Sequence, residues 1–129
     1  MPETQSRILL VEDDEPFADM LQKTLVHAGY AIVRACNGKE ALRLYDAQRP
    51  HLVLTDLIMP GTEGVELIIE LRRRHPGVRI IAMSGGGRNR PGAYLQAAQL
   101  LGAACTLPKP FANLELLAAI QAVLNAETA

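Results

Sequence analysis

The chain has 129 residues, a formal net charge of −1 at pH 7, and 49% hydrophobic residues. That length suits one domain with a sizeable core, and the nearly balanced charge gives no general attraction to nucleic acid. Because no apolar run approaches the roughly 20 residues of a membrane span and residues 1–6 lack the basic and apolar regions of a secretory signal, we expect a cytoplasmic domain that binds neither nucleic acid nor membranes.

Short β-rich runs alternate with longer amphipathic stretches along the chain. The expected strands are Ile8–Val11, Ala31–Ala35, Leu52–Thr55, Val78–Met83 and Ala104–Leu107. Four of them are nearly continuous apolar runs, which is typical of strands buried on both faces of a sheet. Cys36 and Cys105 lie next to such runs or within them, so we expect both to be reduced core residues.

Helices are expected between and after these strands. The first carries one apolar face at helical spacing and stops at Gly29, a residue suited to a helix C-terminus; that face comprises Phe17, Met20, Leu21, Thr24 and Ala28. The others are expected at about 38–48, 64–75, 91–102 and 111–125. Arg72–Arg74 should form a solvated end of the third helix, where cations favour the helix dipole.

Five βα units with short connections predict a parallel sheet with helices on both faces. The predicted fold is therefore an α/β three-layer (βα)5 sandwich. We expect one domain over residues 7–126, with short tails at 1–6 and 127–129 and no output domain.

Polar residues follow four of the five expected strands, and ligands of open α/β sheets bind beyond the carboxyl ends of the strands. These residues are Glu12, Asp13, Asp14, Asp56, Ser84 and Lys109. Clustered carboxylates repel each other by about 4 kcal/mol per pair at about 4 Å and an effective dielectric constant near 20. A hard cation such as Mg²⁺ offsets that repulsion, whereas zinc usually takes cysteine or histidine ligands.

Each of these residues also fits a simpler interpretation. We expect Asp14 to cap the first helix, and Asp56, Ser84 and Lys109 taken singly fit a turn, a loop hydroxyl and a surface lysine. Four strand ends that bring polar groups to one point favour a shared site instead. In such a site Asp56 would be a nucleophile towards phosphorus, while Lys109 and Ser84 would neutralise phosphoryl oxygens.

The chain resembles the receiver domains of two-component response regulators over essentially its whole length, and in particular single-domain regulators like those of chemotaxis. The resemblance lies in ILLVEDD at 8–14, LVLTDLIMPGTEG at 52–64, IIAMSGG at 80–86 and LPKPF at 107–111. It implies the flavodoxin-like fold with a five-stranded parallel sheet in the order 2-1-3-4-5.

The resemblance also implies a bound Mg²⁺, for which Mn²⁺ can substitute. Its expected ligands are the carboxylates of Glu12, Asp13 and Asp56 and the backbone carbonyl of Ile58. Asp13 is expected to touch the metal directly and Glu12 through water.

By the same resemblance Asp56 is the phosphoacceptor, and Ser84 and Lys109 contact the phosphoryl group. The bond between Lys109 and Pro110 is expected to be cis. The implied function is a phosphorylation-dependent switch, not an enzyme with foreign substrates. The implied donor is a sensor histidine kinase or a histidine phosphotransfer domain. The implied partner is a downstream protein or a second copy of the chain in a homodimer. The face formed by the fourth helix, fifth strand and fifth helix is expected to contact it.

Two positions depart from the family pattern. Thr106 stands where many receivers carry an aromatic residue, and the glycine-rich loop at 85–92 is longer than usual. Ile58 and Gly86 flank the site with side chains that cannot position an attacking water, which predicts slow to moderate self-dephosphorylation.

Three other functions remain open. One is a phosphorylation-independent binding module, and a second is a flavin-binding relative of flavodoxins, for which the acidic residues 12–14 are unsuited. A third is a phosphatase, although this chain has Ile58 at the position where a phosphatase would need a second catalytic acid.

The fifth helix has an apolar arc wider than one buried stripe, and we expect a partner to cover part of it. The arc comprises Leu114, Leu116, Leu117, Ala119, Ile120, Val123 and Leu124.

Overall fold

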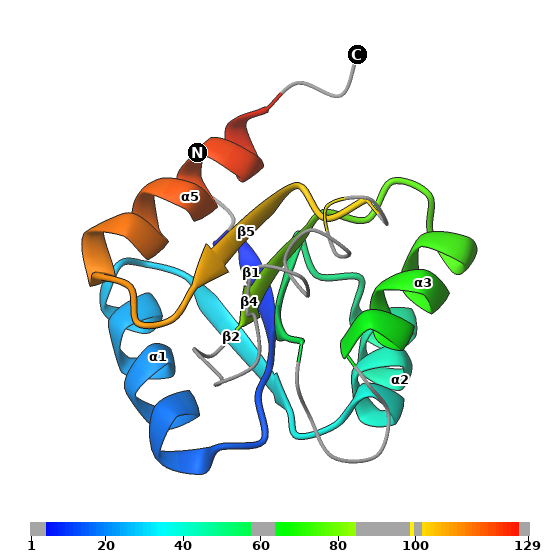
Figure 1. Ribbon diagram of the computed structural model, residues 1–129, viewed down its shortest axis with the longest axis horizontal. Coiled ribbons are helices and arrows are strands. Elements are labelled where there is room, and N and C mark those ends of the chain that lie inside the picture. Colours follow the sequence, from blue (N-terminus) through cyan, green and yellow to red (C-terminus); the bar gives the residue numbers. More distant parts are fainter. Residues whose placement is uncertain (1–4, 58–63, 85–98, 100–101, 127–129) are drawn as a thin grey trace.

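A computed structural model, drawn in Figure 1, describes residues 5–57, 64–84, 99 and 102–126. These residues contain five strands and four helices. The strands are β1 (Arg7–Val11), β2 (Ala31–Ala35), β3 (Leu52–Asp56), β4 (Ile80–Ser84) and β5 (Cys105–Pro108). The helices are α1 (Glu15–His27), α2 (Gly38–Gln48), α3 (Gly64–Arg74) and α5 (Asn113–Asn125). The Ile58 carbonyl, the 85–92 loop and most of the expected fourth helix lie outside the described residues.

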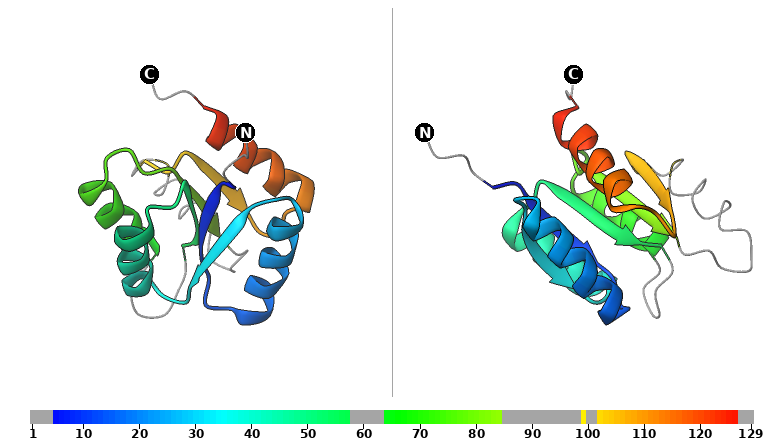
Figure 2. Two further views of the ribbon diagram at one scale, coloured as in Figure 1. Left: turned by 180° about the vertical axis from the view of Figure 1, so that it is seen from behind. Right: turned by 90° about the vertical axis from the view of Figure 1, so that its left-hand side faces the viewer.

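All strand pairs are parallel, and the order of the strands in the sheet is β2-β1-β3-β4-β5. Helices α1 and α5 cover one face of the sheet and helices α2 and α3 cover the other (Figures 1 and 2). The predicted three-layer fold and strand order are therefore confirmed. None of the helices in the described part of the chain is long and apolar enough to span a membrane.

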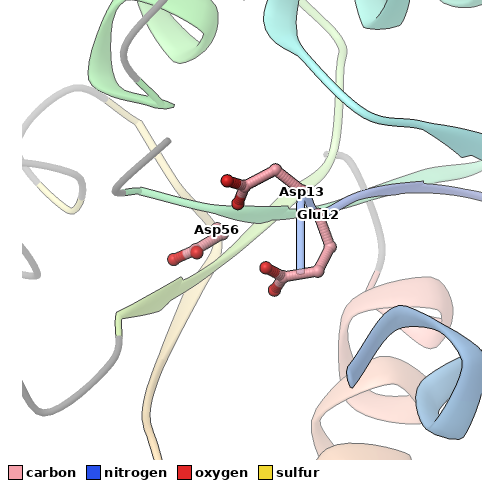
Figure 3. A group of neighbouring side chains, drawn as sticks. All are labelled: Glu12, Asp13 and Asp56. Atoms are coloured by element: carbon pink, nitrogen blue, oxygen red, sulfur yellow. The ribbon is translucent and has the colours of Figure 1, made fainter. Parts of the chain in front are cut away.

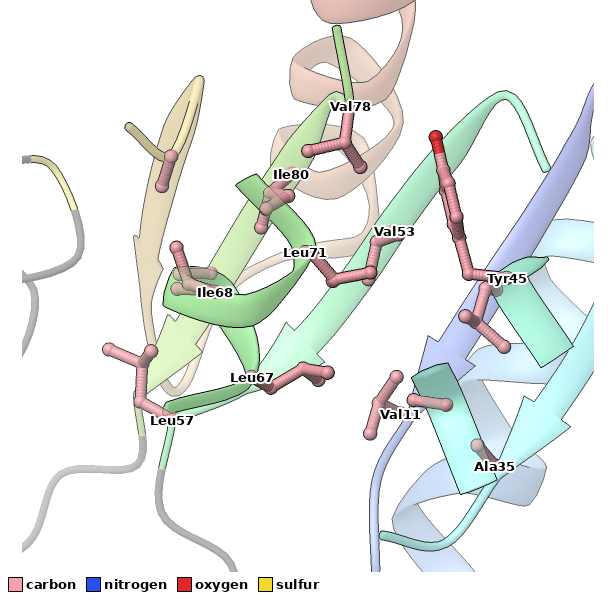
Figure 4. Close-up of a cluster of buried hydrophobic side chains, with 14 residues drawn as sticks. Val11, Ala35, Tyr45, Val53, Leu57, Leu67, Ile68, Leu71, Val78 and Ile80 are labelled. Atoms are coloured by element: carbon pink, nitrogen blue, oxygen red, sulfur yellow. The ribbon is translucent and has the colours of Figure 1, made fainter. Parts of the chain in front are cut away.

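Alternate residues of each central strand pack on opposite faces of the sheet, because successive side chains of a strand point in opposite directions. On β1, Leu9 and Val11 join the cluster beneath α2 and α3 (Figure 4), whereas Ile8 and Leu10 join the cluster beneath α1 and α5. All four are at most 1% exposed. The sheet thus lies between two apolar layers, which explains the continuous apolar runs in the sequence.

Side chains cap the first two helices. The Asp14 carboxylate accepts a hydrogen bond from the Phe17 N–H at 3.2 Å, as predicted for the start of α1. Asn37 caps α2 by accepting a hydrogen bond from the Glu40 N–H at 2.8 Å. Both caps satisfy N–H groups that the first turn of a helix leaves without partners.

The rotation of α1 differs from the expected one. Ala18, Leu21 and Leu25 form its buried face, whereas Met20 is 47% exposed. Placing Met20 on the buried stripe was therefore wrong, because the sheet contacts a face turned towards Ala18.

The prediction that Cys36 is a core residue was also wrong. Cys36 is exposed after the end of β2, where its N–H and thiol donate to the Glu40 carboxylate.

Some element boundaries differ by one or two residues from those expected. Strand β4 begins at Ile80, and α5 begins at Asn113 because the Ala112 N–H donates to the Glu115 carboxylate at 2.9 Å, which marks the first turn. Arg73 and Arg74 are exposed and pair with Glu70. The solvated end predicted for α3 is therefore confirmed.

Candidate functional site

The carboxyl ends of four strands form one edge of the sheet, and their register brings the predicted polar residues to it. Val11 of β1 pairs with Thr55 of β3, so Glu12 and Asp56 follow side by side. Asp56 in turn pairs with Met83, and Ser84 pairs with Pro108. Lys109 directly follows the end of β5, and its N–H donates to the Ser84 carbonyl at 2.8 Å.

Three carboxylates gather at this edge. Glu12, Asp13 and Asp56 each offer an oxygen atom, and these atoms lie within 4.8 Å of one another (Figure 3). Glu12 is 3% exposed and Asp56 is 6% exposed, whereas Asp13 faces solvent. The cluster therefore combines two buried acids with one acid at the mouth of the site.

The Lys109 ammonium lies against the two buried acids. Its Nζ is 3.1 Å from Glu12 Oε1 and 3.5 Å from Asp56 Oδ2, and the Lys109 side chain is 18% exposed. The peptide bond between Lys109 and Pro110 is cis, as the resemblance implied. The sequence positions of these three side chains are far apart, so the strand order alone brings them together.

The electrostatics of the cluster show an excess of negative charge. Burial raises the pKa of Glu12, and the neighbouring Asp56 carboxylate raises it further, while the Lys109 ammonium opposes both effects. Within the described part of the chain, one ammonium contacts two of the three carboxylates of the cluster. An added cation would lower the cost of keeping all three ionised.

The donor set fits Mg²⁺. The group contains carboxylate oxygens and neither thiol nor imidazole, and Mg²⁺ prefers one or two carboxylates together with water and phosphate oxygens. Asp13 is exposed to solvent, so a cation held by the cluster could keep water ligands on that side.

Ser84 supplies a buried hydroxyl at the end of β4. Its side chain is fully buried, and its Oγ has no hydrogen-bond partner among the described residues. A buried polar group without a partner costs about 1–3 kcal/mol. A site that gains a ligand oxygen next to this hydroxyl would recover that cost.

The structure thus brings Glu12, Asp13, Asp56, Ser84 and Lys109 to one edge of the sheet, while Ile58 lies outside the described residues. Sequence reasoning assigned Phe17 only to an apolar stripe. In the structure its ring lies under the Lys109 ammonium, 4.3 Å from ring centroid to Nζ. The feature of the sequence that could have indicated this contact is an aromatic residue in the first helical turn after the acidic residues 12–14.

Comparison with known proteins identifies relatives over almost the whole chain. Residues 8–121 match the family model described as the response regulator receiver domain. The response regulator MprA of Mycolicibacterium vanbaalenii is 37% identical over 95% of this chain and 52% of its own length. MprA of Mycobacterium leprae is 36% identical over 92% of this chain and 51% of its own length. The chain therefore spans about half the length of these curated relatives.

Solved structures agree with this result. The CheY-like receiver domain protein of Methanospirillum hungatei superposes with a TM-score of 0.85 and 27% identity, over 95% of both chains. The chemotaxis protein CheY4 of Vibrio cholerae superposes with a TM-score of 0.82 and 27% identity, over 93% of this chain and 99% of that one. With the family match over 8–121, the chain belongs to the response regulator receiver domains, which are regulatory domains of two-component systems and act as phosphorylation-dependent switches.

Proposed function

We propose that this chain accepts a phosphoryl group on Asp56 and that the modification changes which protein it binds. The observation that carries the proposal is the position of the buried Asp56 carboxylate. It ends a central strand, lies 3.5 Å from the Lys109 ammonium, and belongs to a cluster of acids suited to a divalent cation.

In the transfer step an Asp56 carboxylate oxygen attacks the phosphorus of a phosphohistidine. The new bond joins that oxygen to phosphorus, and the bond from phosphorus to the imidazole nitrogen breaks, leaving the electron pair on nitrogen. Such a transfer needs positioning and charge neutralisation more than covalent help. The sensor histidine kinase or histidine phosphotransfer domain that supplies the group is the kind of partner that the family implies.

Lys109 and Ser84 would hold the transferred group. The Lys109 Nζ already lies within 3.5 Å of Asp56 Oδ2, so its ammonium is close to where phosphoryl oxygens would come. The Ser84 hydroxyl would donate to one of those oxygens and gain the partner that it lacks among the described residues. The modification would therefore change the contacts at the end of β4.

Glu12, Asp13 and Asp56 would hold the cation, together with the carbonyl of Ile58, which lies outside the described residues. When bound, Mg²⁺ would neutralise negative charge on the phosphoryl oxygens and between the carboxylates. The downstream partner would be a target protein or a second copy of the chain, contacted through the face that includes β5 and α5.

The test is labelling with radioactive acetyl phosphate. Wild type should be labelled with Mg²⁺ present, and EDTA should abolish the labelling. D56N should remain unlabelled, whereas D46N, which removes a carboxylate from α2 outside the cluster, should be labelled like wild type. Equal labelling of wild type and D56N would remove Asp56 from this role. Absence of any labelling would favour a phosphorylation-independent binding module.

We further propose that the phosphoryl group persists for longer than seconds. Ile58 and Gly86 carry no group able to orient a hydrolytic water, although both lie outside the described residues. Loss of label should be followed after the donor is removed, in wild type and in Ile58→Asn, which places a carboxamide at position 58. Decay of wild type within a few seconds would contradict the proposal.

A further inference from the structure

We propose that Phe17 is a positioning residue for Lys109: the face of its ring holds the ammonium beside Asp56. The inference rests on the proposed function, in which Lys109 binds the phosphoryl group on Asp56. Phe17 is not one of the acidic, hydroxyl or lysine residues already assigned to the site. It belongs to α1, a helix whose other role is to cover the sheet.

The geometry is that of a cation over an aromatic face. The Lys109 Nζ lies 4.3 Å from the centroid of the Phe17 ring, within the roughly 6 Å over which such attraction acts. The same Nζ contacts Glu12 at 3.1 Å and Asp56 at 3.5 Å. Because the Lys109 side chain is only 18% exposed, the attraction is less weakened by water than at an open surface.

One contact fixes the backbone of Phe17, and another packs against its ring. The Phe17 N–H donates to the capping Asp14 carboxylate at 3.2 Å, which fixes the first turn of α1. Phe111, which follows Lys109 and Pro110, packs against the Phe17 ring edge-to-face, with centroids 6.2 Å apart and planes at 65°. The ring is therefore a fixed support, while the lysine has a flexible four-carbon stem.

This support has a consequence for binding of an anion at Asp56. A lysine that is free to rotate must lose side-chain entropy when it meets a phosphoryl group. A lysine already held near Asp56 meets the anion without that loss, which is the advantage of preorganised charge. Removing the ring face should therefore weaken phosphoryl binding although no atom of Phe17 needs to touch the anion.

The first test compares three variants by titration with beryllofluoride, a phosphoryl mimic, in the presence of Mg²⁺. F17L keeps an apolar side chain but removes the ring face, and it should weaken binding by about three- to tenfold. F17Y keeps the ring and should bind within about twofold of wild type. Y30L is the matched control, because it removes an aromatic ring that packs on the same apolar layer and does not lie over the ammonium. Equal losses in F17L and Y30L would overturn the proposal.

The second test changes the ring charge while keeping its shape almost constant. Phenylalanine with one, two or three fluorine atoms, placed at position 17, should weaken beryllofluoride binding stepwise, because fluorine depletes the negative face of the ring. The same series at position 111 should show no such trend. A purely structural role of Phe17 predicts flat series at both positions, and that result would also overturn the proposal.

The contact can also be measured without any phosphoryl mimic, which separates this inference from the proposed function. A single fluorine on the Phe17 ring should change its ¹⁹F chemical shift when K109M removes the ammonium. If wild type is not labelled and binds no beryllofluoride, the proposed function fails while this shift still tests the contact. An unchanged shift in K109M would refute the contact even in a protein that is labelled normally.

Discussion

Two side chains of the site are kept in conditions that cost folding free energy. Burial and the nearby Asp56 raise the pKa of Glu12, which means that its charged form is less stable here than in water. The Ser84 hydroxyl is buried and has no hydrogen-bond partner within the described ranges. Such costs are typical of groups that are kept for a ligand and not for the free fold.

This reasoning gives a prediction for Ser84. S84A should leave the free energy of unfolding unchanged or raise it by about 1 kcal/mol, because it removes a buried hydroxyl that has no partner among the described residues. The same variant should weaken beryllofluoride binding. Urea denaturation without ligand and titration with beryllofluoride measure the two effects.

Thr55 provides the control for Ser84. It is also fully buried, but its hydroxyl donates to the Asp56 carbonyl at 3.0 Å. T55V should therefore lower the free energy of unfolding by about 1 kcal/mol through loss of a satisfied hydrogen bond. A loss of stability in S84A as large as that in T55V would show that the Ser84 hydroxyl has a partner in the free protein.

Among the elements, the strands and their carboxyl ends were the most predictable from sequence. Ile8–Val11 and Leu52–Thr55 are apolar because both faces of the sheet are covered, and the polar residue after each run marks the site. The rotation of α1 was less predictable, since Met20 and Ala18 both fit an apolar stripe and only packing decides between them. The contact between Phe17 and Lys109 depends on strand order, so local periodicity could not predict it.

Helices α2 and α3 are joined by a surface network of charges. Asp46 of α2 lies 2.7 Å from His75 Nε2 and 3.0 Å from Arg74, at the end of α3. The hydrogen bond from His75 holds the pKa of Asp46 below its ordinary value of 3.8. Hydrogen bonds from Arg73 and Arg74 lower the pKa of Glu70 from its ordinary value of 4.5 to about 2.

These shifts predict how stability depends on pH in acid. Because both carboxyl pKa values are lower in the folded protein, the unfolded chain binds more protons below about pH 4.5. The contribution of Glu70 to stability is therefore present above pH 4.5 and should be lost as pH falls towards 2. E70Q should make the pH dependence shallower in that window, as measured by urea denaturation at each pH.

A control for that prediction is K39Q, which removes an exposed charge from α2 without removing a carboxyl group. It should keep the acid dependence of wild type. Added salt should weaken the effect of Glu70 in wild type, because exposed ion pairs are screened. An E70Q curve that follows the wild-type curve between pH 4.5 and 2 would contradict the network's role.

Helix α5 divides its apolar arc between the core and solvent. Leu116, Ile120 and Val123 are buried against the sheet, whereas Leu114 is 80% exposed. L116A should lower the free energy of unfolding by about 2–5 kcal/mol, as for large-to-small changes in a core. L114E should change it by less than about 0.5 kcal/mol. A loss in L114E comparable to that in L116A, measured by urea denaturation, would mean that Leu114 is covered in solution.

At the scale of the whole molecule, the sheet separates two apolar layers, and the acidic cluster lies at the edge where the strands end. Carboxylates that repel each other at this edge oppose the native register of β1 against β3. The charge of the site is thus coupled to the stability of the entire fold. Addition of a cation at the cluster should stabilise the whole domain and not one helix.

We therefore expect Mg²⁺ to raise the free energy of unfolding of the whole domain. At a concentration ten times its dissociation constant, a ligand that binds only the folded state adds about 1.4 kcal/mol. Urea denaturation with increasing MgCl₂, at constant ionic strength, should show that increase in wild type. EDTA should reverse it.

Asp13 gives this expectation its sharpest test, because it lies at the exposed mouth of the cluster and removing its charge leaves the buried core intact. Without metal, D13N should equal or exceed wild type in stability, since one repulsive carboxylate is gone. When Mg²⁺ is added, D13N should show little of the increase in free energy of unfolding that wild type shows, whereas D46N should show the full increase. The two curves for D13N and wild type should thus approach or cross as Mg²⁺ increases. An equal gain in both proteins would place the cation elsewhere, and the repulsion at the strand ends would then need another counter-charge.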